Sequence, residues 1–228
     1  SSFTSHNFRF RNISEINALL DEIGVSVKEI LFVEHHLGHA AGAYYLSPWN
    51  LDEDVLIFTA DAAGDGISST VSIGQKGEIN RIKDSESTYF HSLGYCFYGE
   101  ITNYLGMVEG DHEYKVMGLA PYGKSSYCLD KIKGIVDIDS SNPLKFKNHM
   151  NSFKPSFEIE LRSLLRGQRF DNIAAATQEW FEVLITKWIR NAIEKTGIHK
   201  IACAGGNFLN VKANQKILAL EEVDDAFF

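Results

Sequence analysis

Two histidines four residues apart, His35 and His39, constrain the fold of this chain more than any other feature. They follow an apolar run at 29–33, which predicts a strand, and begin a run of small residues that predicts a helix at about 36–46. Residues i and i+4 share one face of a helix, so both imidazoles point to one side. The pair alone fits a structural role equally well. Asp61 ends the next apolar run, and two imidazoles with one carboxylate commonly bind divalent iron or zinc.

The size and charge of the chain limit its class. Its 228 residues suffice for one or two domains, and a net charge of −8 argues against nucleic-acid or acidic-membrane partners. The cysteines Cys96, Cys128 and Cys203 are scattered, which indicates reduced thiols and a cytoplasmic protein. Cys203 lies in an apolar run and is expected in the core. No stretch has the length of a membrane span, and no signal peptide is visible.

The first part of the chain predicts one helix before the strand and the histidine helix. Asn12 with Glu15 resembles a capping box, apolar residues follow at helical spacing, and Gly24 predicts the stop. Pro48 ends the histidine helix and begins a linker to a second lobe. The chain has no initiator Met and ends in an apolar run, so we expect a piece of a longer protein.

The rest of the chain predicts an antiparallel meander followed by alternating helices and strands. Apolar runs separated by glycine turns define the meander, and an apolar stripe with core aromatics defines the longest helix. The expected strands are 55–60, 67–73, 79–82 and 200–204, with a last strand at the end, and the expected helices are 93–105, 171–196 and 208–220. Residues 106–170 are expected to form an insertion. This α/β order is typical of a ribonuclease-H-like half-domain.

A glycine turn follows Asp61. Gly64 and Gly66 allow positive φ and let backbone N–H groups face an anion, and the hydroxyl of Ser68 beyond them is a candidate phosphate donor. The alternative is a plain hairpin turn capped by aspartate.

A second glycine pair, Gly205 and Gly206, joins an apolar strand to a helix and is followed by Asn210. Glycines at such a junction bring the backbone close to a ligand, and the helix N-terminus favours negative charge. The segment lacks both the Walker ending and the third glycine of the dinucleotide fingerprint. A simple tight turn is an equally good interpretation.

The segment 113–123 is apolar and interrupted by Gly, Pro and Gly. We predict that it is too irregular for a helix or a strand and that it packs beside a site. Lys115 within it is a candidate for holding a phosphate or a substrate carboxylate. A surface lysine with a packed aliphatic stem is an equal alternative.

These motifs occur together, in one order, over residues 30–228. They are HHLGHAAGAYY (35–45), Asp61 with its glycine turn, EYKVMGLAPYG (113–123) and GGNFLN (205–210). In this combination the chain resembles the O-carbamoyltransferases of the NodU nodulation-protein and antibiotic-tailoring (CmcH) type.

The resemblance implies a Kae1-like region of actin/Hsp70-like (ASKHA) fold, built from ribonuclease-H-like lobes and incomplete in this chain. Residues 1–48 would be the end of the first lobe, and residues 49–228 most of the second with an insertion at about 106–170. A YrdC-like domain would follow in the full-length chain. Whether the protein forms a homodimer is left open by the sequence. We expect the isolated piece to be inactive, because parts of the family pattern are missing at both ends.

The resemblance also implies the chemistry. The YrdC-like domain would make carbamoyl-adenylate from carbamoyl phosphate and ATP, and the Kae1-like region would pass the carbamoyl group to a hydroxyl of a sugar or natural product. A divalent metal, most often iron, would bind His35, His39 and Asp61. The nucleotide would contact the residues Gly205, Gly206 and Asn210.

Two other functions stay open at this point. One is a tRNA threonylcarbamoyl transferase, which is also Kae1-like, although the negative charge argues against tRNA. The other is a non-catalytic nucleotide- or metal-binding protein of the actin/Hsp70 fold. The sequence does not name the acceptor.

Overall fold

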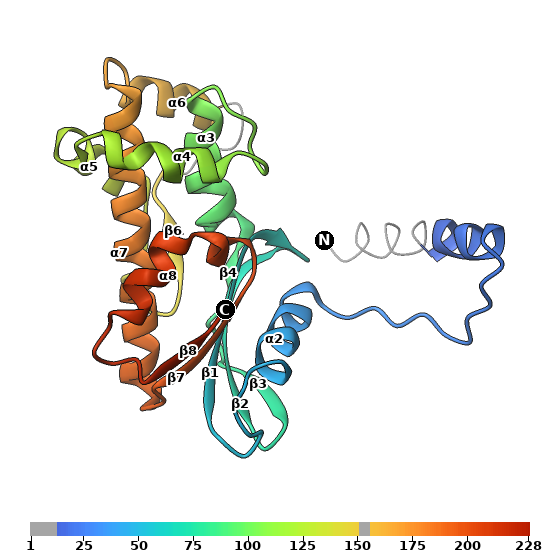
Figure 1. Ribbon diagram of the computed structural model, residues 1–228. Coiled ribbons are helices and arrows are strands. Elements are labelled where there is room, and N and C mark those ends of the chain that lie inside the picture. The colour runs from blue at the N-terminus through green and yellow to red at the C-terminus, as the bar shows by residue number, and fades with distance from the viewer. Residues whose placement is uncertain (1–12, 151–155) are drawn as a thin grey trace. The chain divides into compact units, whose positions relative to one another are not determined.

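The computed structural model describes residues 13–150 and 156–228 and divides into two compact units, Ser1–Val33 and Glu34–Phe228 (Figure 1). In the first unit a helix covers residues 13–22. Gly24 ends it with a φ of +70°, and the N–H groups of Gly24 and Val25 bond the carbonyls of Asp21 and Leu20, so the predicted stop is confirmed. Asn12, the expected cap, lies outside the described residues.

The strand expected at 29–33 is wrong. These residues have no strand structure, and the side chains of Leu31, Phe32 and Val33 are exposed. A strand needs a neighbour for its backbone hydrogen bonds, and nothing in the described part of the chain pairs with this segment. Apolar composition alone therefore did not produce a strand here.

A mixed six-stranded sheet lies at the centre of the second unit. In spatial order its strands are β3 (Glu78–Arg81), β2 (Ile67–Gln75), β1 (Val55–Gly64), β7 (Lys200–Ala204) and β8 (Asp225–Phe227), and β4 (Ser87–Thr88) pairs with β2. The first three strands are antiparallel, which confirms the predicted meander, whereas β1, β7 and β8 run parallel. Both hairpin turns have two residues at positive φ, Asp65-Gly66 and Lys76-Gly77, as tight hairpins require.

Helices cover both faces of this sheet (Figure 1). Along β1, Leu56 and Phe58 face the main core with α7 (Phe170–Thr196), whereas Ile57 faces α2 (His35–Tyr45). This alternation follows from the two-residue period of a strand. All nine apolar-stripe positions predicted for α7 are buried, which confirms that helix and its core role: Ile173, Thr177, Trp180, Phe181, Leu184, Ile185, Trp188, Ile189 and Ile193.

The remaining elements surround the main core. They are η1 (Tyr89–His91), η2 (Gly94–Gly99), α3 (Glu100–Tyr104), α4 (Glu113–Leu119), η3 (Ala120–Tyr122), η4 (Ser125–Tyr127), α5 (Leu129–Lys133), β5 (Val136–Ile138), β6 (Phe146–Asn148), α6 (Ser156–Leu164), η5 (Gly206–Leu209) and α8 (Val211–Leu218). The helix expected at 93–105 is formed by η2, a π-helical turn, and α3. None of the described helices is both long and apolar enough to cross a membrane.

Two differences from the sequence analysis concern the site. The segment 113–123, expected to be irregular, is helical over α4 and η3, and both pieces pack against α7. The compact unit also begins before α2, which packs on the sheet. The lobe boundary at residue 48 and the insertion stay predictions. Cys203 is buried in the core, as predicted.

Candidate metal centre and adjoining cavity

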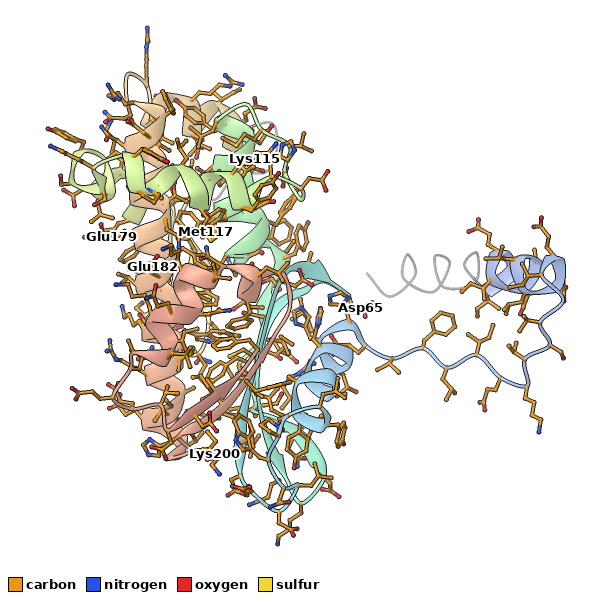
Figure 2. All side chains as sticks on the ribbon, in the orientation of Figure 1. Asp65, Lys115, Met117, Glu179, Glu182 and Lys200 are labelled. Atoms are coloured by element: carbon orange, nitrogen blue, oxygen red, sulfur yellow. The ribbon has the colours of Figure 1, made fainter. Side chains whose placement is uncertain are left out.

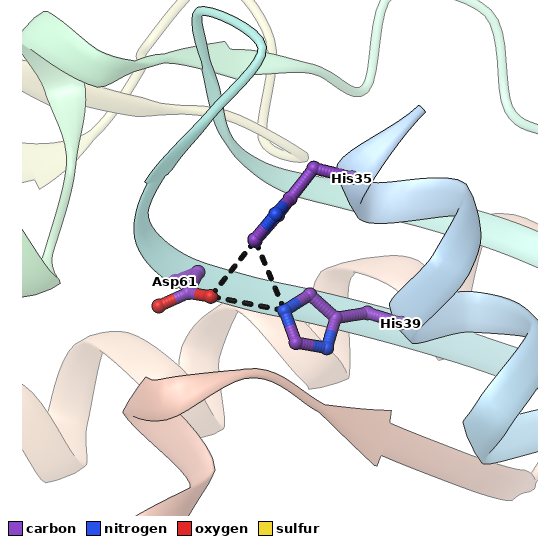
Figure 3. A group of neighbouring side chains, drawn as sticks. All are labelled: His35, His39 and Asp61. Atoms are coloured by element: carbon purple, nitrogen blue, oxygen red, sulfur yellow. Dashed lines mark hydrogen bonds and ion pairs between the residues drawn. The ribbon is translucent and has the colours of Figure 1, made fainter. Parts of the chain in front are cut away.

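Three of the predicted site residues meet at one point (Figure 3). Nε2 of His35 lies 3.0 Å from Oδ2 of Asp61, Nε2 of His39 lies 2.9 Å from the same oxygen, and the two nitrogens are 3.1 Å apart. The side chains of His35, His39 and Asp61 are 39%, 31% and 22% exposed, so solvent and ions can reach them. The structure therefore brings together, across 26 residues of chain, the three groups that the sequence proposed as metal ligands.

The start of α2 is held by acidic side chains. Glu34 is the N-cap residue and accepts hydrogen bonds from the N–H groups of His36 and Leu37. Its carboxylate also pairs with Arg81 of β3. Asp65 of the β1–β2 turn accepts from the N–H of His35 at 2.9 Å. These bonds anchor the first turn of α2, which carries His35, to the hairpin that carries Asp61.

Asp61 lies where the β1–β2 register is interrupted, between Ala60 and Gly64. Such a bulge re-aims side chains next to it. Burial raises the pKa of Asp61, but hydrogen bonds from His35, the Ala62 N–H and His39 more than offset this, so its pKa lies below the usual range. The carboxylate is therefore ionised at neutral pH and gives the site a negative charge.

Two glycines make room for this cluster. A β-carbon on Gly64 would lie 2.1 Å from the His35 ring, and one on Gly206 would lie 3.0 Å from Oδ1 of Asp61. The first contact is too close for any side chain, so Gly64 allows His35 to lie against β1. The second contact places Gly206 directly beside the carboxylate, a link that the sequence analysis did not anticipate.

The donor atoms fit a divalent cation. Ligands in neighbouring octahedral positions at bond lengths of about 2.1 Å lie about 3.0 Å apart, and the three donor separations here are 2.9, 3.0 and 3.1 Å. Two imidazole nitrogens and one carboxylate oxygen on one face are typical of non-haem iron(II), and zinc uses the same donors. Both nitrogens point at one oxygen, an arrangement that a shared cation would satisfy.

Sequence reasoning did not single out His36. This side chain is completely buried between α2 and the sheet. Its Nδ1 lies 2.8 Å from Oγ1 of Thr59, and its Nε2 lies 3.1 Å from the carbonyl oxygen of Ile67. Burial lowers the pKa of His36, so the ring is neutral. Position i+1 in a helix gives no signal that separates such a role from an ordinary surface histidine.

A cavity of about 260 Å³ adjoins the cluster at Asp61. Its wall comes from β1, η2, α4, α7 and the η5–α8 turn. The lining is mostly aromatic and apolar, with carboxylates and amides added: Asp61, Ala62, Gly94, Tyr98, Gly110, Asp111, Glu113, Tyr114, Met117, Phe181, Gly206, Asn207, Leu209 and Asn210. Two motifs that the sequence analysis singled out, 113–123 and 205–210, thus form walls of one cavity.

Asn210 lines this cavity, but its amide is already bonded. It caps α8 by accepting from the N–H of Ala213, and it exchanges two hydrogen bonds of 2.9 Å with the amide of Gln178. The Gln178 oxygen also accepts from the hydroxyl of Tyr98 at 2.7 Å. Gln178, which the sequence analysis did not single out, therefore fixes two residues of the cavity wall.

The structure does not bring four other candidates to the cluster. The Ser68 hydroxyl is buried and donates to carbonyl oxygens of β4, so it does not face an anion. Gly66 is a turn residue with φ of +83° and lies in open space. Gly205 has φ of +103° and lies against the Ala60 carbonyl, a contact that fits a tight turn. The exposed Lys115 lies on α4 (Figure 2). Its amino group extends over the neighbouring Tyr114 ring, and the side chain does not line the cavity.

Comparison with known proteins identifies relatives. Residues 6–228 match the family described as "Carbamoyltransferase N-terminus". Nodulation protein NolNO of Sinorhizobium fredii is 31% identical over 92% of this chain and 30% of its own length. Nodulation protein NolO of Bradyrhizobium diazoefficiens is 29% identical over 86% of this chain and 35% of its own length. The chain thus spans about a third of the length of these curated relatives.

Proposed function

Because this chain belongs to the NodU-type carbamoyltransferases and matches their N-terminal region, we propose that the full-length protein transfers a carbamoyl group from carbamoyl-adenylate to a hydroxyl of a small-molecule acceptor. The acceptor oxygen forms a bond to the carbamoyl carbon and loses its proton to solvent, the bond from that carbon to the phosphate oxygen breaks, and AMP leaves. Such a transfer needs positioning and charge stabilisation and no covalent enzyme intermediate.

The observation that carries this proposal is the convergence of His35, His39 and Asp61 at the edge of the cavity. We assign the three side chains as ligands of a divalent ion, with iron as the first choice on their donor set. When bound, such an ion supplies Lewis-acid stabilisation of charge on carbonyl or phosphate oxygens. Asp61 belongs both to the cluster and to the cavity wall, so a ligand in the cavity would have its reactive end beside the ion.

The cavity suits the adenylate on chemical grounds. Tyr98, Tyr114 and Phe181 offer aromatic faces for a base, and Gly206 leaves the backbone open at Asp61. Asn210 would contribute to the wall through its pair with Gln178. None of the lining residues in the described part of the chain is Lys or Arg, so positive charge for the phosphate would come from the bound ion.

The same proposal covers the architecture. We assign the chain to an actin/Hsp70-like, Kae1-like region made of ribonuclease-H-like lobes. The strand order β3-β2-β1-β7-β8 supports this, since β3, β2 and β1 are antiparallel neighbours and β7 and β8 run parallel to β1. A YrdC-like domain elsewhere in the full-length protein would make the adenylate from carbamoyl phosphate and ATP. We favour a small-molecule acceptor over tRNA, because a net charge of −8 disfavours a nucleic-acid partner.

One variant of the full-length protein tests the proposal. His35→Ala should remove more than nine-tenths of carbamoyl transfer, measured as product mass, and leave pyrophosphate release from ATP unchanged, because adenylate formation would take place in another domain. Mutation of a residue that only hydrogen-bonds a metal ligand typically costs about 10- to 100-fold in metal affinity, so loss of a ligand itself should cost at least as much. His199→Ala is the matched control, because His199 is an exposed histidine directly before β7. Equal loss of both half-reactions in His35→Ala would contradict the division of labour.

A further inference from the structure

His36 lies in sequence next to one cluster histidine and three residues before the other, yet it faces the sheet. Its ring centroid is 5.3 Å from that of His35 and 6.2 Å from that of His39. The side chain is fully buried. Its partner Thr59 on β1 is also fully buried, and so is Thr70 on β2, the residue opposite Thr59. A buried polar chain of this kind is costly unless every member is bonded, and here every member is.

The direction of each bond follows from donor chemistry. The Ile67 carbonyl can only accept, so Nε2 of His36 carries the proton. Nδ1 then accepts from the hydroxyl of Thr59 at 2.8 Å. Since that hydroxyl has one proton, the 2.6 Å contact between the two threonines must be a donation from Thr70 to Thr59. The chain Thr70–Thr59–His36–Ile67 thus closes a loop through β1, β2 and α2.

This loop joins the elements that carry the cluster. Thr59 lies two residues before Asp61 on β1, and His36 adjoins His35 on α2. Within the described part of the chain, neither His35 nor His39 makes a hydrogen bond through Nδ1. Metal-binding histidines usually have such a bond, and it fixes the ring. Here the position of the two rings relative to Asp61 must come from the placement of α2.

We propose that His36 is the positioning residue of the His35–His39–Asp61 site, and that it acts through the Thr59 hydroxyl. By bonding β1 and β2 at once, its ring sets the distance of α2 from the strand that carries Asp61. This inference rests on the proposed metal site and adds a residue that need not touch the metal. It predicts that metal affinity depends on one buried hydroxyl that lies outside the cluster.

The test uses cobalt(II) as the probe, because its visible absorption reports coordination as well as affinity. Thr59→Val has nearly the same shape but lacks the hydroxyl, and Thr59→Ser restores it. Thr102→Val is the matched control, since Thr102 is equally buried on α3 and also loses a 2.8 Å hydrogen bond, the one to the Tyr98 carbonyl. Circular dichroism at the titration temperature establishes that each variant is folded.

We expect Thr59→Val to weaken cobalt binding about 10- to 100-fold and to change its visible spectrum, whereas Thr59→Ser and Thr102→Val stay within about threefold of the parent. His36→Gln, which keeps an N–H donor near the Nε2 position but has no acceptor at the Nδ1 position that faces Thr59, should weaken binding in the same way. A folded Thr59→Val protein with parental affinity and spectrum would overturn the positioning role. If the parent itself binds no cobalt, the metal site of the proposed function fails first and the inference falls with it.

Discussion

At the scale of single residues, the adjacent glycines Gly205 and Gly206 have different roles, one in the backbone of the turn and one in the cavity wall. Gly205 has φ of +103°, and a β-carbon there would lie 2.4 Å from the Ala60 carbonyl oxygen, so this glycine is required by the approach of the turn to β1. Gly206 has no such backbone neighbour. It faces Asp61 and lines the cavity, which makes it the position at which a side chain would obstruct a ligand.

Gly206→Val should therefore lower AMP affinity at least tenfold in the full-length protein, because the added methyl groups would occupy the cavity beside Asp61. Titration calorimetry measures the affinity, and a thermal melt checks the fold. Gly118→Val is the control, since Gly118 lies on α4 in open space. Unchanged AMP affinity in a folded Gly206→Val protein would show that the turn is only structural and that the nucleotide binds elsewhere.

At the scale of elements, two tryptophans of α7 hold the β5–β6 hairpin to the core. Nε1 of Trp180 donates to the Val136 carbonyl at 2.7 Å, and Nε1 of Trp188 donates to the Leu144 carbonyl at 2.8 Å. The Trp188 ring also lies at 5.0 Å from a phenylalanine of β1 and from another of β6. One helix thus joins the hairpin to the central sheet, and each buried indole N–H has its partner.

Trp188→Ala should lower the free energy of unfolding by about 3–5 kcal/mol, because it leaves a large cavity and an unpaired carbonyl. Urea denaturation followed by circular dichroism measures this change. Val183→Ala on the exposed face of α7 should change it by less than about 0.5 kcal/mol. A loss below about 1 kcal/mol in Trp188→Ala would mean that the hairpin does not depend on this contact.

At the scale of the whole molecule, the proposed metal site links α2 to the β1–β2 hairpin, and a bound ion would therefore stabilise the folded unit Glu34–Phe228. A ligand at a hundredfold excess over its dissociation constant adds about 2.7 kcal/mol to the stability of the state that binds it. For a chain of this size, that corresponds to a rise of about 5–10 °C in the melting temperature.

We expect iron(II), added without oxygen, or zinc to raise the melting temperature by this amount, and EDTA to reverse the rise. Asp61→Asn should remove most of the shift, because it replaces the one anionic donor of the cluster. Asp111→Asn changes a carboxylate of the same cavity outside the cluster and should keep the shift. An equal shift in both variants would place the ion somewhere other than at His35, His39 and Asp61.

Local sequence patterns determined most of the elements of this protein. The meander, the long helix α7 and the strand β7 follow from apolar periodicity and turn residues, which act between near neighbours. The spacing of His35 and His39 likewise predicted a shared helix face, because four residues make about one turn. The family motifs are also short local segments, so they could be identified from the sequence without knowledge of tertiary contacts.

Tertiary structure alone decided what these parts form together. The bulge at Asp61, the buried bonds of His36 and the pairing of Gln178 with Asn210 join residues far apart in sequence, and no local pattern encodes such contacts. The same cause explains the errors: residues 29–33 lack a partner strand, and residues 113–123 are helical where an irregular segment was expected. A side chain's chemistry is local, but its surroundings are set by the packing of distant segments.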